Sequence, residues 1–542
     1  MKKNRILATT AGILAASLLL AGCAGSGGGA PEGSGGAGNP EAIVTTNGTE
    51  PENILIPTMT NEVGGGKILD LINATLVYYD VDGAVQNELA ESITPNEDAS
   101  EWTIKIKPGQ KFSDDTEIKA DNFIKAWNYG ANPKNGHLSG YFFEPIEGYS
   151  ADEGKDVPEL SGLQKVDEHT FTVKLKEPTS DFGLRLGYSA FAPLPDVAFD
   201  DLEAYGNAPL ASGPYMLAKD GWEHNVKVDL VPNPNYEGPR TPKNGGISIV
   251  FYATQDAAYN DLLANNLDVL DALPDSAFGT YEDELAGRSV NQPSAVFQSV
   301  TIPNIDHFTG EEGKLRRQAI SMAINREEVT DVVFSGTRTP ASDFTSPVID
   351  GWSDSLPGNE VLKFNPEKAK ELWAEADKIS PWSGTLEIGY NSDGGHQAWV
   401  EAVTNQLSNN LGIEAKGKPY AAFKELRQEV NDRSIKNAFR TGWQADYPGL
   451  YNFLAPLYAT GAGSNDTDYS NLEFDKLLAE GAKATSVDEA NKHFEQAQTI
   501  LLEDLPSIPL WYSNVVGGWS ESVSNVKFGW NSVPVYYEIT KN

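Results

Sequence analysis

The sequence predicts an α/β protein built from at least two lobes, and three observations lead to this prediction. The chain has 542 residues, whereas a single hydrophobic core stops growing at about 250 to 300 residues. Segments near residues 101 and 170 alternate apolar and polar side chains, which predicts a small antiparallel sheet with one wet face. The region 385–443 instead alternates strand and helix patterns. That order predicts a mostly parallel sheet in another lobe.

The chain begins with the pattern of an export signal. Three basic residues within the first five precede an apolar run over residues 6–20. The run is too short and too interrupted to span a membrane, which takes about 20 apolar residues. The stretch Leu20-Ala21-Gly22-Cys23 resembles the lipobox of bacterial lipoproteins, whose cysteine is acylated and becomes the first mature residue. We therefore expect a signal peptide over residues 1–22 and a lipid on Cys23.

Residues 23–40 are predicted to be a flexible tether, because after the lipidated cysteine they consist almost entirely of Gly, Ser, Ala and Pro. Cys23 is the only cysteine, which excludes an internal disulfide. The net charge is −36, so the protein should repel both nucleic acid and anionic lipid. The lipid alone must then hold it at the extracytoplasmic face of the bacterial cell membrane, as on a Gram-positive cell surface.

Two strands support the antiparallel sheet. In Glu101–Lys107, Trp102, Ile104 and Ile106 alternate with polar side chains until Pro108-Gly109. His169–Lys176 repeats this pattern. Both segments should therefore turn one face towards a core and the other towards water.

The parallel sheet follows from the order of elements in the second half. We expect strands over 385–390, from 413 and over 437–443, separated by helices over 399–411 and 420–430. Parallel sheets bind ligands outside the carboxyl ends of their strands. Two loops leave such ends, at 391–396 and 444–449, and a binding site should lie there.

No catalytic motif is present. The chain lacks HExxH, GxSxG, GxxxxGK[ST] and CxxC patterns, and its six histidines are scattered. We therefore predict no catalytic residues, no metal site and no cofactor. A surface hydrolase remains an alternative, because 77 acidic residues always place some carboxylates near each other.

Five segments carry a family resemblance. They are FSDDTEIKADNFIKAW (112–127), SGPYML (212–217), NPNYEG (233–238), KLRRQAISMAINREEV (314–329) and RTGWQADYPGLYNFL (440–454). The first four resemble the peptide-binding family, family five, of ABC-transporter solute-binding lipoproteins. The last resembles its oligopeptide-binding branch in particular. The similarity covers nearly everything after the tether.

The resemblance implies a periplasmic-binding-protein-like clamp with mixed sheets, hinged by two crossing strands, and an extra lobe inserted near its N-terminus. The domain boundaries expected on this basis are lobe I at 41–75, 208–300 and 508–542, the inserted lobe at 76–207, and lobe II at 301–507. The family binds short peptides between its lobes. It delivers them to the transmembrane permease subunits of an ABC importer, and the receptor is expected to be a monomer.

Asp446 and Arg440 are the main candidates for binding the two charged ends of a peptide. Residues six apart in an extended segment point to the same side, and their Cα atoms lie about 20 Å apart at roughly 3.3 Å per residue. Subtracting the reach of the arginine and aspartate side chains leaves on the order of 10 Å between their charged groups, which suits a peptide of about three residues. The alternatives are a turn-forming role for Asp446 and a surface ion pair for Arg440. An oligosaccharide or another solute is the alternative ligand, but sugars carry no terminal charges.

The remaining candidates rest on the resemblance. His396 resembles a family histidine near the carboxylate of longer peptides, and Glu62 an acidic residue near the peptide amine. The alternative for each is an exposed loop residue. The aromatic residues Trp443 and Tyr447 either line the cleft or pack the strand. Gly442 and Gln444 offer main-chain hydrogen bonds.

Overall fold

The computed structural model describes residues 39–542 apart from 52, 61–62, 153, 393–395 and 422. The predicted signal peptide, Cys23, nearly all of the tether and Glu62 lie outside the described residues. Within the described part, no helix is both long and apolar enough to cross a membrane.

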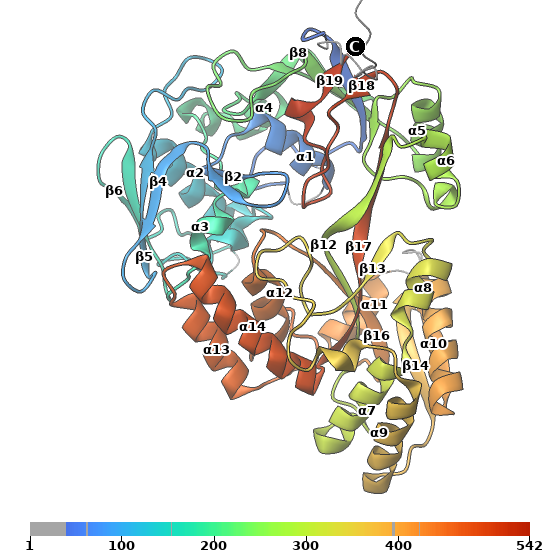
Figure 1. Ribbon diagram of the computed structural model, residues 1–542. Helices are drawn as coiled ribbons and strands as arrows, with labels where there is room; N and C mark the ends of the chain where they lie inside the picture. The colour runs from blue at the N-terminus through green and yellow to red at the C-terminus, as the bar shows by residue number, and fades with distance from the viewer. Residues whose placement is uncertain (1–38, 52, 61–62, 153, 393–395, 422) are drawn as a thin grey trace, which may run out of the picture. The chain divides into compact units, whose positions relative to one another are not determined.

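Two strands of thirteen residues, β12 (Ser289–Thr301) and β17 (Ser507–Trp519), are the longest in the described chain. They pair antiparallel, with register shifts between Pro293 and Phe297 and between Gln298 and Ser299. Figure 1 shows them side by side, running from the part that carries α5 (Gln255–Leu263) and α6 (Tyr281–Leu285) to the part that carries α8 (Arg326–Val332) and α10 (Gln397–Leu411). They are the two strands that connect the lobes, as the family resemblance predicts.

Both lobes contribute to one sheet of eleven strands, with β12 and β17 in the middle. Its hydrogen-bonded order is β15 (Glu414–Tyr420), β14 (Thr385–Asn391), β16 (Ala438–Gln444), β12, β17, β11 (Val269–Leu270), β1 (Ile43–Gly48), β10 (Gly246–Phe251), β9 (Lys227–Pro232) and β8 (Tyr215–Glu223). The eleventh, β13 (Arg338–Pro340), pairs with β17. Parallel and antiparallel pairs both occur, so the sheet is mixed as predicted.

Lobe I is built on β1 and β8 to β11. Helix α1 (Val63–Ile72) packs on this part of the sheet, and Ile68, Leu69 and Ile72 enter a core shared with β1, β10 and the C-terminal segment. That segment contributes the short antiparallel pair β18 (Val523–Ser524) and β19 (Thr540–Lys541). The two ends of the described chain therefore meet in this lobe.

The inserted lobe contains the predicted antiparallel sheet, in the order β4 (Ala90–Pro95), β5 (Glu101–Ile106), β7 (Thr170–Lys174) and β6 (Leu163–Lys165). Burial alternates strictly along β5, which confirms the pattern read from the sequence. Helix α2 (Ala120–Ala131) places Trp127 on this sheet, edge-on to Phe171 and Phe191. The smaller elements of the lobe are β2 (Val77–Tyr79), β3 (Val85–Asn87), α3 (Phe182–Arg185) and α4 (Leu202–Asn207).

Lobe II has the predicted strand and helix order. β14 is parallel to both β15 and β16, and α10 and α11 (Phe423–Asn431) connect them. β15 is a full strand of seven residues, although the sequence indicated only a short one. The other helices of the lobe are α7 (Gly310–Ala323), α8, α9 (Pro366–Ile379), α12 (Leu450–Tyr458), α13 (Leu472–Ala482) and α14 (Val487–Asp504).

A buried carboxylate lies against one of the connecting strands. Asp343, which follows β13, accepts hydrogen bonds from the Tyr512 hydroxyl of β17 at 2.9 Å and from the Thr345 backbone and hydroxyl at 2.8 Å each. Its side chain is fully buried. Burial raises the pKa of Asp343 to about 6, although these hydrogen bonds oppose the shift.

Asp343→Asn should stabilise the protein above pH 6. A carboxyl whose pKa is raised by folding stabilises the native state below its unfolded pKa, and this contribution is lost as pH rises through the folded value. The shift corresponds to about 2 to 3 kcal/mol, and asparagine can keep the same partners without the charge. Urea unfolding at pH 4.5 and pH 7.5 checks this. An Asp343→Asn variant that is equally destabilised at both pH values would contradict it.

Candidate functional site

The two loops singled out by the strand order lie at one edge of the lobe II sheet. β14 and β16 are parallel, so their carboxyl ends point the same way. Arg440 of β16 donates through Nε to Asn391 Oδ1 at the end of β14, at 2.8 Å. This bond ties β16 to the start of the 391–396 loop.

The outer edge of β16 presents main-chain groups at two predicted positions. Ala445 N donates to Ala295 O at 2.9 Å, and hydrogen-bonded pairs alternate along an antiparallel ladder. Residues 441 and 443 therefore bond to β12, while the N–H and C=O of Gly442 and Gln444 point to the opposite edge. The register with β14 ends at Phe439, and both residues are exposed.

A large cavity that opens to solvent adjoins the end of β16. Gln444, Ala445 and Asp446 form its lobe II side. The other walls come from α1, from residues 73–80 and 187–189, from Arg240 and from the C-terminal segment 529–537. A ligand in this space would touch all three lobes.

Asp446 enters the cavity as a carboxylate without a counter-ion among the described residues. Its Oδ2 accepts from Asn452 Nδ2 at 3.0 Å, and its backbone N–H donates to Asn452 Oδ1 at 3.0 Å. Burial raises the pKa of Asp446, while the Asn452 hydrogen bond and the charge of Arg185 lower it. The site therefore holds a partly desolvated acid whose side-chain partner among the described residues is a neutral amide.

Tyr447 follows Asp446 but points away from the cavity. Its ring is buried, and its hydroxyl donates to the Asp181 carboxylate of the inserted lobe. Arg185 holds the same carboxylate at 2.9 Å and stacks on the Tyr447 ring at 5.1 Å. Tyr447 thus packs against the inserted lobe in this structure.

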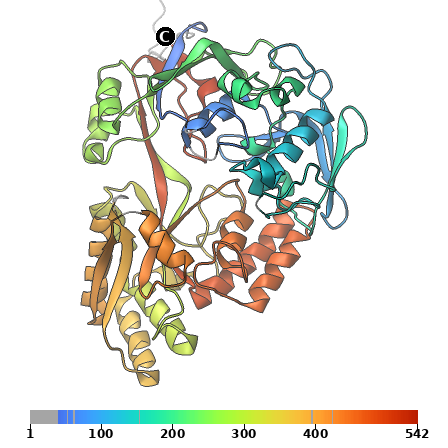
Figure 2. The same ribbon diagram turned by 180° about the vertical axis from the view of Figure 1, so that it is seen from behind.

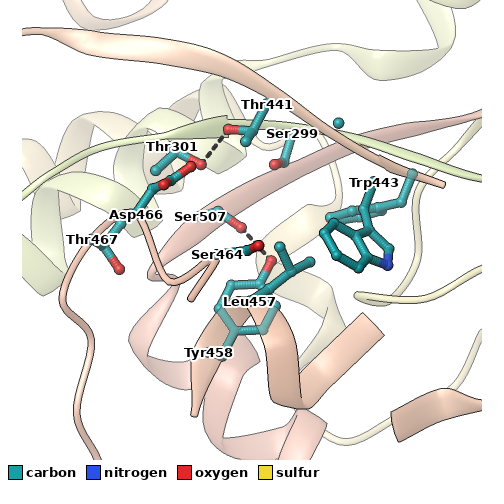
Figure 3. Close-up of a pocket in the computed structure, with 12 residues that line it drawn as sticks. Ser299, Thr301, Thr441, Trp443, Leu457, Tyr458, Ser464, Asp466, Thr467 and Ser507 are labelled. Atoms are coloured by element: carbon teal, nitrogen blue, oxygen red, sulfur yellow. Dashed lines mark hydrogen bonds between the residues drawn. The ribbon is translucent and has the colours of Figure 1, made fainter. Parts of the chain in front are cut away.

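A second, smaller pocket lies between β16 and α12 (Figure 3). Three consecutive residues of β16 line it: Thr441, Gly442 and Trp443. Hydroxyl groups form much of the remaining wall, and two pairs of them are bonded to each other, Thr301 with Thr441 and Tyr458 with Ser507. Trp443 therefore lines a hydroxyl-rich pocket that is separate from the cavity at Asp446.

His396 and Arg440 are not among the residues that line the larger cavity. His396 lies at the start of α10, where its Nδ1 accepts from Trp399 Nε1 at 3.1 Å. That bond assigns the ring proton to Nε2. Thr60 and Val63 do line the cavity, on either side of the undescribed residues 61–62. No group of three or more potential metal ligands occurs in the described part of the chain.

Apart from the candidate Glu62, the sequence did not indicate the lobe I and inserted-lobe side of the cavity. Asp70, Tyr79, Tyr188 and Trp530 line it, from three segments that are far apart in the chain. No motif links them. Only the helical spacing of Asp70 with Val63, Gly66 and Lys67 could have placed it on a shared face.

The comparisons with known proteins agree with this architecture. A model of the bacterial extracellular solute-binding proteins, family 5, matches residues 84–465. The chain belongs to this family. The predicted family is therefore confirmed, and it is a family of binding proteins.

Curated relatives cover almost the whole chain. The dipeptide-binding protein DppE of Bacillus subtilis is 24% identical over 501 residues, which are 90% of this chain and 89% of DppE. The periplasmic oligopeptide-binding protein OppA of Escherichia coli is 25% identical over 503 residues, 87% of each chain. A solved structure of the murein tripeptide-binding protein MppA, in its unliganded open form, has a TM-score of 0.81 at 22% identity and covers 92% of this chain and 97% of that one. This likeness confirms the two-lobed α/β fold.

Proposed function

We propose that this protein is a lipid-anchored extracytoplasmic receptor that binds short peptides between its lobes and delivers them to an ABC importer. One observation carries the proposal. The outer edge of β16 offers main-chain groups at Gly442 and Gln444, with a carboxylate, Asp446, beyond one end and a guanidinium, Arg440, at the other.

An extended peptide fits this edge in one direction. Its main chain would pair with Gly442 and Gln444 as an added strand, its α-ammonium would meet Asp446, and its carboxylate would lie towards Arg440. Such a peptide runs antiparallel to β16. Main-chain pairing recognises no particular side chain, so many peptide sequences of suitable length should bind. Trp443 would then border the side-chain positions of the peptide, and His396 its carboxylate end.

A sugar ligand is less well matched to the same groups. An oligosaccharide has no terminal charges, and it would leave the Asp446 carboxylate unpaired as the lobes enclose it. The names of the relatives DppE and OppA refer to dipeptides and oligopeptides, which favours peptide as the ligand class of this chain.

Mass spectrometry of ligands released by denaturing the purified protein tests the proposal. Peptides of a few residues are the expected cargo, and sugars or other solutes would overturn it. Incubating the protein with added peptides separates binding from hydrolysis, since a receptor returns them intact. We further propose that the partner is a pair of permease subunits and that the receptor works as a monomer, without nucleic-acid partners.

Cys23→Ser should release the protein from the membrane without unfolding it. A two-chain lipid on Cys23 would hold the protein stably, and its strongly acidic body offers no attraction to anionic lipid. The expected result is mutant protein in the soluble fraction with unchanged peptide affinity. A mutant that stays membrane-bound through its amino terminus would contradict the proposed anchor.

A further inference from the structure

One face of α1 lines the larger cavity. Val63, Gly66, Lys67 and Asp70 all take part, and their spacing is that of residues stacked on one side of a helix. Lys67 and Asp70 thus bring one cation and one anion to the lobe I wall. Their partners determine how much charge a ligand would meet there.

The two cations of this wall are already engaged. Lys67 Nζ forms a buried ion pair with Asp271 and donates to Asn47 O at 3.1 Å. Arg240 binds both carboxylate oxygens of Glu88, at 2.7 and 3.0 Å, and donates to the Asp70 and Asn73 backbone carbonyls. Arg240 therefore holds the main chain of Asp70 and not its carboxylate.

The Asp70 carboxylate has no hydrogen bond or ion pair among the described residues, although it is accessible from the cavity. Asp70 is exposed to the cavity, and partial desolvation raises its pKa above the usual value, with the charge of Arg240 opposing the shift and that of Glu88 adding to it. Asp80 differs, because its carboxylate accepts bonds from its own turn, at the backbone N–H groups of Asp82 and Ala84. Asp70 and Asp446 are therefore the two lining acids that a ligand can satisfy.

Aromatic side chains line the cavity together with these two acids. Burial raises the pKa of Tyr79 well above its usual value, and the charges of Asp70 and Asp446 both add to the increase. The phenol itself donates to Leu184 O at 2.6 Å. The Tyr79 ring packs edge-on against Trp530 at 5.4 Å. Tyr79 and Trp530 thus form an aromatic part of the cavity wall, in the same cavity as a lobe I acid and a lobe II acid.

We infer that Asp70 is a specificity-determining residue that selects peptides whose first residue carries a basic side chain. The inference rests on the proposed function, in which Asp446 binds the α-ammonium. A lysine or arginine at the first position would pass its apolar stem along Tyr79 and Trp530 and bring its cation to Asp70. A peptide with a neutral first residue would shield Asp70 from water without supplying a counter-ion, which is unfavourable.

Three tripeptides test this inference: Lys-Ala-Ala, norleucine-Ala-Ala and Ala-Ala-Lys. Norleucine keeps the apolar stem of lysine without its charge, and Ala-Ala-Lys moves the charge away from Asp70. Calorimetry should show that the wild-type protein binds Lys-Ala-Ala about tenfold or more tightly than the other two, since close charge pairs across an interface couple by more than about 1.4 kcal/mol.

Asp70→Asn should remove this preference. The variant should bind Lys-Ala-Ala about tenfold or more weakly than wild type does, while its affinity for norleucine-Ala-Ala stays the same or rises. An unchanged melting temperature of the ligand-free variant shows that α1 is intact. Equal wild-type affinities for Lys-Ala-Ala and norleucine-Ala-Ala, or a lysine preference that survives in the variant, would overturn the inference while leaving peptide binding in place. Failure of all three peptides to bind would instead overturn the proposed function, and this inference with it.

Discussion

Asp446→Ala is expected to weaken tripeptide binding by roughly two to four orders of magnitude. In the proposed complex the peptide α-ammonium and the Asp446 carboxylate are both removed from water, which costs several kcal/mol per ion and is offset only while both charges are present. Removing one partner of such a pair costs about 3 to 5 kcal/mol, against under about 1 kcal/mol for a surface ion pair. Calorimetry with a single tripeptide measures this loss directly.

Asp446→Asn separates the charge from the structure of the loop. Asn452 Nδ2 donates to Asp446 Oδ2, and Asn452 Oδ1 accepts from the Asp446 backbone. An asparagine oxygen can accept the first bond equally well, so this variant should keep the loop and lose only the charge. Its affinity should fall nearly as far as that of Asp446→Ala. An Asp446→Asn variant that binds normally would show that Asp446 only organises the turn.

An acetylated peptide completes a double cycle. Acetylation removes the ammonium, so it should weaken wild-type binding severely and matter much less in Asp446→Ala protein. Additive penalties would mean that another group reads the amine, and Glu62 would then be the next residue to test. The four combinations of protein and peptide therefore test the pairing itself and not merely the importance of the loop.

Local patterns in the sequence predicted the parts of the fold that short segments determine. The alternation in β5 and the strand and helix order from β14 to β16 depend on side chains a few residues apart, and both are present in the structure. The same order placed Asp446 in a loop at the carboxyl edge of β16, where it lines the cavity. In these cases the sequence pattern and the structural element that it predicts both involve residues close together in the chain.

Long-range contacts left no such signal. Tyr447 was a candidate for the cleft, yet its hydroxyl bonds to Asp181, which is 266 residues away in the chain. The sequence did not point to Asp70. Its carboxylate lacks an ion-pair partner among the described residues because Arg240 pairs with Glu88 instead, and these residues are far apart in the chain. The motif residue Arg326 is likewise buried and bonded to carbonyl groups of Pro509 and Leu362. A pattern read along the chain cannot tell such structural residues from binding residues.

The loop of Asp446 depends on a buried ion pair in the inserted lobe. Asp181 and Arg185 form a contact of 2.9 Å with side chains only 7% and 14% exposed. In both views α13 lies beside the inserted lobe (Figures 1 and 2), and next to this pair Ser180 bonds the Gly481 and Ala482 carbonyls at 2.8 Å each. Through the Tyr447 hydroxyl, the pair therefore connects the inserted lobe to the lobe II residue that follows Asp446.

Arg185→Met should destabilise the protein by about 3 to 5 kcal/mol, because it leaves Asp181 buried with only a tyrosine hydroxyl as partner. The double variant Asp181→Asn, Arg185→Met should recover much of this loss, since no charge is then left buried. Lys125→Met breaks an exposed pair with Asp196 in the same lobe and should cost under about 1 kcal/mol. Urea unfolding of the four proteins measures these differences, and equal losses for Arg185→Met and Lys125→Met would show that the buried pair is not structural.

Arg185→Met should also affect peptide binding through Asp446. Burial raises the pKa of Asp446, and the Arg185 charge is one of two influences that hold it down. Without that charge, Asp446 should take up its proton at a higher pH, and a protonated Asp446 cannot pair with an ammonium group. The pH below which tripeptide affinity falls should therefore move upward in Arg185→Met and stay unchanged in Lys125→Met. A loss of stability alone would lower the fraction of folded protein without moving this pH. Calorimetric titrations of the folded fraction from pH 4 to pH 8 therefore distinguish an electrostatic role of Arg185 from a purely structural one.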